Sequence, residues 1–146
     1  MSRKAEILTG IVDRLAGLKP DTIKTINYQT IKLAFSDFQD WELPVIQLID
    51  AGESVTHEMG RARKEWDIGL EIVLKSTEEG VVRQQDLFDL QNLVELELWQ
   101  DPNLGIPGVI DMKYLGSQSD LAMVKPYFFV RIDFQVRYYD ALLSKC

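Results

Sequence analysis

The chain has 146 residues, of which 46% are hydrophobic and 27% are charged, with 16 Lys and Arg against 23 Asp and Glu. This composition excludes a disordered chain, and the net charge of −7 excludes the basic surface that non-specific nucleic-acid binding requires. No apolar run is long enough to span a membrane, and the N-terminus lacks the apolar core of a signal peptide. The lone cysteine, Cys146, cannot form an internal disulfide and indicates a reducing compartment.

The first amphipathic stretch, residues 2–18, places an apolar residue at every third or fourth position. This spacing predicts a helix whose apolar stripe packs on a sheet. Gly17 and Pro20 are the stop signals that follow such a helix. The polar face mixes acids and bases, which argues against a membrane anchor. The stripe consists of Ile7, Leu8, Ile11, Val12, Leu15 and Leu18.

Residues 22–50 predict two or three short strands. Ile31, Leu33 and Phe35 alternate with polar or small residues, and residues 44–49 (PVIQLI) form an apolar run led by a proline. Residues 51–64 (AGESVTHEMGRARK), in contrast, have no clean periodicity, and we expect an extended loop there. The loop contains His57, the only histidine, which has no neighbour that completes a metal site or a catalytic pair.

Two long strands are predicted at residues 65–75 and 127–139. Apolar side chains alternate with polar ones in both, as expected for strands with one buried face. Their similar length and complementary polar faces predict that they are adjacent and antiparallel. The polar residues that would face each other are Asp67 and Glu71 on one strand and Arg131 and Arg137 on the other.

Between these strands we predict a turn at 76–80, a second helix at 82–100, a short strand at 109–115 and a loop at 116–125. The helix has an apolar stripe of Leu87, Leu90, Val94 and Leu98, which Phe88, Leu93 and Trp99 widen. Seven acids between residues 78 and 101 stand against Arg83 alone, a balance of −6. These acids are Glu78, Glu79, Asp86, Asp89, Glu95, Glu97 and Asp101.

The expected fold is therefore a single α+β domain over residues 1–146, with an antiparallel sheet of about four to six strands, two helices packed on one face and the extended loop at 51–64. No nucleophile, phosphate-loop, dinucleotide or zinc motif is present. We expect no catalytic, cofactor-binding or metal-binding residues, and no enzyme activity. A small α+β enzyme or ligand-binding protein with an unrecognised site remains an alternative.

The order of the elements around residues 98–105 (LWQDPNLG) carries a family resemblance. This segment closes the second helix and is followed by a short strand (GVIDMKYLG) and a long alternating strand. The arrangement resembles the tail terminator proteins of long-tailed bacteriophages, also called tail completion or tail-to-head joining proteins, over most of the chain. The sequence departs from their pattern at Ile106 and Pro107, which separate Gly105 from Gly108.

The resemblance implies a structural protein of the virion neck, assembled in the host cytoplasm, with no cofactor and no membrane contact. Such proteins form a ring, usually of six copies, that caps the tail tube protein, stops tube elongation and joins a head-connector or neck protein. DNA would pass through the ring without tight binding. Another neck or baseplate component of the same fold is the alternative.

Two groups of residues receive roles in this interpretation. Arg61, Arg63 and Lys64 are the densest positive charge, and we expect their loop to be mobile until it meets a neighbouring subunit or the tail tube. The second group would line an acidic lumen that repels DNA. Its members are Glu78, Glu79, Asp86, Asp89, Glu95 and Glu97.

Overall fold

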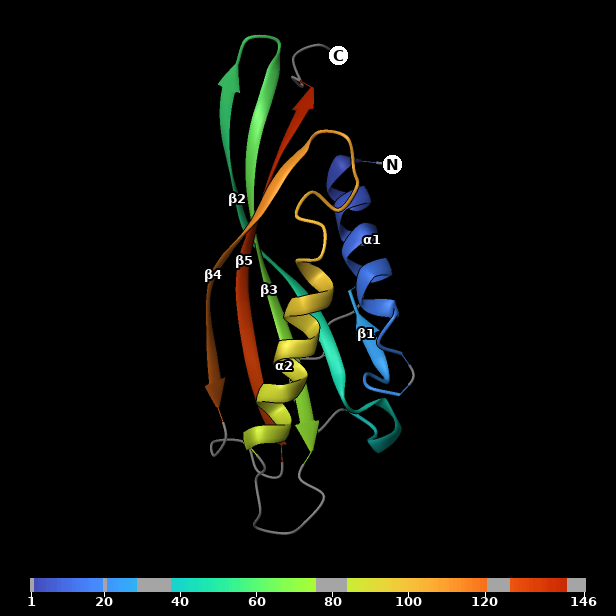
Figure 1. Cartoon of the computed structure of the whole chain (residues 1–146). Helices are drawn as coiled ribbons and strands as arrows, with labels where there is room; N and C mark the ends of the chain where they lie inside the picture. The colour runs from blue at the N-terminus through green and yellow to red at the C-terminus, as the bar shows by residue number, and fades with distance from the viewer. Residues whose placement is uncertain (1, 20, 29–37, 76–83, 121–126, 142–146) are drawn as a thin grey trace.

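The computed structural model describes residues 2–19, 21–28, 38–75, 84–120 and 127–141. It shows a five-stranded sheet with two helices on one face (Figure 1). The expected α+β class is confirmed. The elements in chain order are α1 (Arg3–Ala16), β1 (Thr25–Asn27), the 3-10 turn η2 (Asp40–Glu42), β2 (Val45–Glu58), β3 (Arg61–Lys75), α2 (Gln84–Leu98), β4 (Val109–Asp120) and β5 (Tyr127–Ala141).

The strand order is β1-β2-β3-β5-β4, in which only β1 runs parallel to its neighbour. The predicted adjacency of the two long strands is confirmed, because β3 and β5 pair antiparallel along their whole length. Glu71 lies opposite Arg131 as predicted, and Asp67 lies opposite Gln135 and accepts a hydrogen bond from it (2.9 Å). Arg137 instead pairs with Asp111 of β4.

The main core lies between the sheet and the helices, and the predicted apolar faces supply it. Alternate residues of β3 and β5 point into it because side chains on a strand change face at each step. The helices contribute the stripes that their spacing predicts. The fully buried members include Ile7, Ile11, Leu15, Ile68, Leu70, Ile72, Leu87, Val94, Leu98, Ile132, Phe134 and Val136.

Helix α1 agrees with its sequence signals. The Ser2 hydroxyl caps it by accepting a hydrogen bond from the backbone N–H of Ala5 (3.1 Å), and Gly17 is the C-cap. The second helix, α2, buries one stripe only. Phe88 and Leu93, predicted to widen that stripe, are half-exposed instead, because α2 contacts the sheet along a single side.

The predicted loop at 51–64 is wrong. These residues complete β2 and begin β3, which pair as a hairpin with a two-residue turn at Met59 and Gly60. The hairpin extends past the helices, and the end of β5 runs beside it (Figure 1). Since no helix covers this part of the sheet, its side chains need no apolar alternation, and the sequence pattern disappears although the strands continue.

The remaining strand and loop predictions have different outcomes: one strand is longer than predicted, others are confirmed, and some lie outside the described residues. Residues 116–120 belong to β4, which is longer than the predicted strand at 109–115, and a bulge beside Gly116 interrupts its alternation. Within 22–50, β1 and the start of β2 are confirmed as strands. The alternation at 31–35, the turn at 76–80 and the start of the second helix before Gln84 lie outside the described residues.

Candidate functional site: the hairpin arm and the acidic helix

The part of the hairpin beyond the helices, residues 51–64, forms a projecting arm. It rises from the sheet where a bulge between Asp50 and Glu53 shifts the pairing of β2 with β3. Gly60, with φ of 77°, makes the tight turn that an L side chain would strain. Met59 beside it is 100% exposed, and Val55 is half-exposed. The arm thus presents apolar side chains to solvent.

The three predicted interface bases lie on this arm but do not form one patch. Arg61 and Arg63 share one face of β3, where both approach the carboxylate of Glu58 (3.7 and 3.5 Å). Arg61 also lies over the ring of Tyr139, 3.6 Å from its centroid. Lys64 is on the opposite face and is only 16% exposed. Arg61, at 52% exposed, is the most accessible of the three.

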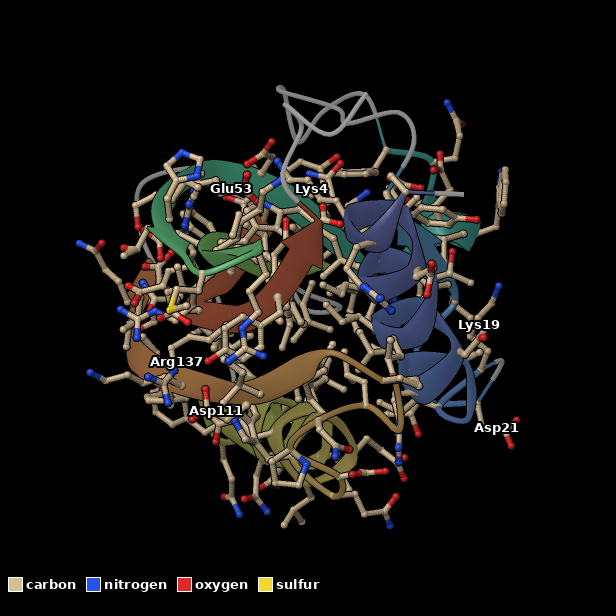
Figure 2. All side chains as sticks on the ribbon, turned by 90° about the horizontal axis from the view of Figure 1, so that it is seen from above. Lys4, Lys19, Asp21, Glu53, Asp111 and Arg137 are labelled. Carbon is tan, nitrogen blue, oxygen red and sulfur yellow. The ribbon has the colours of Figure 1, made fainter. Side chains whose placement is uncertain are left out.

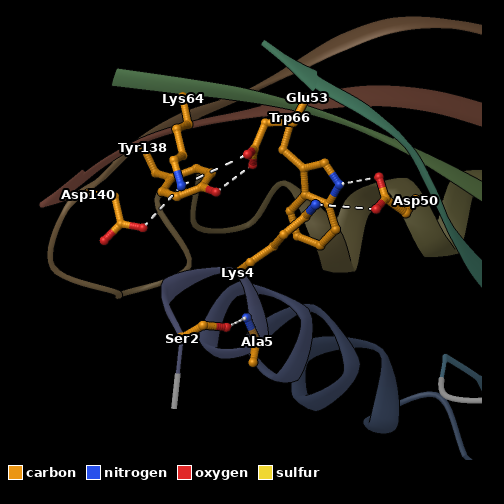
Figure 3. Close-up of polar contacts among 9 residues, drawn as sticks. All are labelled: Ser2, Lys4, Ala5, Asp50, Glu53, Lys64, Trp66, Tyr138 and Asp140. Atoms are coloured by element: carbon orange, nitrogen blue, oxygen red, sulfur yellow. Dashed lines mark hydrogen bonds and ion pairs between the residues drawn. The ribbon is translucent and has the colours of Figure 1, made fainter. Parts of the chain in front are cut away.

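A polar network fixes the base of the arm to α1 and β5 (Figure 3). Tyr138 donates a hydrogen bond to Glu53 (2.6 Å), and Lys64 pairs with Asp140 at 3.3 Å. Burial, together with the Glu53 carboxylate, raises the pKa of Tyr138, so that its hydroxyl stays protonated and donates. The side chains of this network come from β2, β3 and β5, so it stiffens the arm across all three strands.

Asp50 forms the other half of this network. Its carboxylate accepts hydrogen bonds from the indole N–H of Trp66 (2.9 Å) and the backbone N–H of Gly52 (3.0 Å), and it pairs with Lys4 of α1 (3.2 Å). The backbone hydrogen bond from Gly52, then that from Trp66, lowers the pKa of Asp50. Lys4 also lies 4.7 Å from the Trp66 ring centroid.

The second candidate surface is the outward face of α2. From Gln84 to Met112 the chain has no Lys or Arg. Asp86 and Asp89 are exposed, Glu95 and Glu97 are partly exposed, and the other two lumen candidates, Glu78 and Glu79, lie outside the described residues. Exposed apolar side chains are interleaved with these acids: Phe88, Leu93 and Leu96, the last 62% exposed.

The Asp-Pro turn after α2 joins the helix to α1. Asp101 accepts a hydrogen bond from Leu104 N–H through its backbone carbonyl, and its carboxylate pairs with Arg14 of α1 (2.8 Å). Gly105 has a positive φ (66°), and so does Leu104 (57°). The turn therefore positions the two helices and contributes no reactive group.

No group of three or more His, Cys, Asp or Glu within the described ranges could hold a metal ion. His57 is exposed on β2. An open depression on the sheet face away from the helices is lined by Ala51, Asp67, Leu115, Gly116, Ser117, Gln118 and Asp133. Among the helices that the structure describes, none is both long and apolar enough to cross a membrane. Interaction surfaces are thus the features that the described residues present most clearly.

The ion pairs on the outer sheet face are structural. Arg137 donates to Asp111 (2.7 Å) and lowers the pKa of that carboxyl group. Burial raises the pKa of Glu71, against the opposing effect of Arg131.

The sequence predicted the apolar faces and α2, but it did not predict the arm or the polar network at its base. No sequence signal marked the network, because Glu53 falls in the segment without periodicity and the partners are far apart along the chain.

Comparison with known proteins identifies the fold. No family model and no curated protein matches the sequence. A similar solved structure is a chain of the virion of a native gene transfer agent (GTA) particle, with a TM-score of 0.55 and 10% identity. The likeness covers 96% of this chain and 100% of that chain. At this identity it shows that the two chains share a fold along nearly their whole length.

Proposed function

We propose that the protein is a structural component of a virion that forms a ring, of six copies, on the head-proximal end of a tail tube. The ring stops elongation of the tube and joins it to the head connector. The observation that carries this proposal is the near-complete fold likeness to a GTA virion chain. The resemblance of residues 98–105 and the following strands to tail terminators supports the specific position in the neck.

The described surface suits an assembly protein better than an enzyme. Exposed apolar side chains lie on the arm and on α2, as well as at Trp41 and on β4, and a partner could cover them. The net charge of −7 suits a protein through which DNA moves, because like charges repel the phosphate backbone. The acids of α2 are candidates for the lumen, and the arm residues Arg61 and Arg63 for a subunit or tail contact.

The test combines microscopy with an assembly reaction. Purified protein should form rings in negative stain, and its addition to a growing tail tube should limit tube length and leave density at one end. Tubes of unrestricted length, without a cap, would overturn the terminator role. Binding to the head connector but not to the tube end would favour another neck component. Saturable micromolar binding of duplex DNA at physiological salt would contradict passage of DNA without tight binding.

A further inference from the structure

Two exposed surfaces at different ends of the molecule complement each other. We define the arm tip as the turn residue Met59 with Arg61 and Arg63, and the acidic helix face as Phe88, Asp89, Leu93, Leu96 and Glu97. The arm tip combines the exposed Met59 with basic charge, and the acidic helix face combines three exposed apolar side chains with acidic charge. Exposed apolar groups with charged residues beside them are typical of protein–protein interaction sites. On the arm tip two bases share the single carboxylate of Glu58, which leaves an excess of positive charge that an acidic partner would complement.

The acidic helix face retains its charge because the described residues offer it no base. Asp89 and Glu97 form no ion pair within the described chain, whereas the acids Asp101 and Asp111 that follow α2 pair with Arg14 and Arg137. Three large apolar side chains on the same face remain at least two-fifths exposed. Salt bridges and packing that would cover this face must come from another molecule.

The arm tip has the complementary character. Arg61 is 52% exposed and its partner Glu58 is 31% exposed, so the base reaches solvent further than the acid that it pairs with. The side chain of Met59, at the turn, is fully exposed to solvent. Lys64 does not belong to this surface, because Asp140 and Glu53 enclose it on the opposite face of β3.

We propose that the arm tip of one copy docks on the acidic helix face of a second copy. The arm projects at one end of the molecule, and α2 lies toward the other end (Figure 1), so an arm does not reach the α2 of its own chain. Different patches then meet head to tail, and such heterologous contacts close into rings when the rotation permits. The inference rests on the proposed ring and specifies the contact that builds it.

This contact assigns the acids of α2 a different position from the lumen. A helix face covered by a neighbouring arm cannot also line an open channel. Charge matching fixes the register of the contact and accelerates association, while Met59 and Leu96 supply apolar burial. The two roles of Asp89, lumen wall and subunit contact, are therefore distinguishable by experiment.

The experiment mixes two single-cysteine proteins, each in a Cys146→Ser background. One carries Met59→Cys and the other, labelled with a heavy isotope, carries Leu96→Cys. A short bismaleimide should give a heavy–light dimer, and mass spectrometry should locate the bridge between positions 59 and 96. Both residues are exposed, so the variants should melt like wild type. The control replaces Leu96→Cys by Lys19→Cys, an exposed base beside Asp21 at the far end of α1 (Figure 2). Equal yields for the two pairs, or no heavy–light product, would overturn the proposal.

Charge reversal tests specificity. Arg61→Glu and Asp89→Arg should each lower the yield of the 59–96 product by about tenfold, and together they should restore it. A double variant as poor as either single one would contradict the pairing. These experiments distinguish failure of the proposed contact from failure of the proposed function. If no bridge forms but the protein still caps tail tubes, only the contact is wrong; if the bridge forms and tubes grow without limit, only the terminator role is wrong.

Discussion

The same strands behave differently in two regions of the molecule. Under the helices, β2 is buried from Val45 to Leu48, and β3 and β5 fill the core with alternate side chains. In the arm, residues 51–57 of β2 are all exposed, yet the pairing with β3 continues to the turn. The sheet therefore extends by backbone pairing well beyond the region where side-chain burial holds it together.

This difference indicates how each region is stabilised. The core region depends on apolar area removed from water, which is the largest favourable contribution to folding. The arm depends on three paired strands and on the network at its base, where net contributions per hydrogen bond are about 1 kcal/mol. An arm already formed by strand pairing, with exposed apolar groups, suits docking, because less conformational entropy is lost on binding.

The largest effect should come from the core. Phe134 is fully buried and packs edge-to-face on Trp99, with ring centroids 5.5 Å apart. Phe134→Ala should lower the free energy of unfolding by about 3–5 kcal/mol in urea denaturation, since it removes apolar contacts and leaves a cavity. The matched variant Val55→Ala in the arm should change it by about 0.5 kcal/mol or less. Equal stability losses for the two would show that the arm and core do not differ as described.

A smaller effect is expected at the base of the arm. Tyr138→Phe keeps the buried ring but removes the hydroxyl that donates to Glu53, leaving a carboxylate with one partner fewer. The free energy of unfolding should fall by about 1–2 kcal/mol. Faster amide hydrogen exchange should follow at residues 53–58, with little change at 45–48. Tyr139→Phe, which retains the ring under Arg61, is the control and should leave the exchange pattern intact.

The contrast between the buried core and the exposed arm also explains which parts of the fold the sequence predicted. The buried faces of β3 and β5, the stripe of α1 and that of α2 were predictable, because burial imposes a period on the sequence. The arm was not, because uncovered strands carry no such period. Phe88 and Leu93 were misplaced because the pattern alone does not show how wide a stripe the sheet covers.

The network at the base of the arm was beyond sequence reasoning for a different reason. Tyr138 and Glu53 are 85 residues apart, and Lys4 and Asp50 are 46 apart, so no local spacing links them. Their contact depends on the order of strands in the sheet, which places β5 beside β3 and β2 beyond it. The sequence predicted the charge of the two candidate surfaces, but it did not predict which face of the fold each charged side chain occupies. Lys64, for example, shares a sequence cluster with Arg61 but faces the other way.

The smallest expected effect concerns acid stability at Asp50. Its pKa is lowered below 3.8 in the folded protein by the hydrogen bonds from Gly52 and Trp66 and by Lys4. A depressed carboxyl pKa contributes stability above the unfolded-state value, and this contribution is lost as the pH falls through the folded-state value. Asp50→Asn keeps an acceptor oxygen for Trp66 but removes the charge. Wild type should therefore be the more stable of the two at pH 7, and this advantage should begin to shrink below about pH 4 and disappear only below the lowered folded-state pKa of Asp50. Asp89→Asn, whose carboxylate has no ion-pair partner among the described residues, is the matched control. A difference for Asp50→Asn that persists unchanged at low pH would show that the charge of Asp50 does not hold the base of the arm.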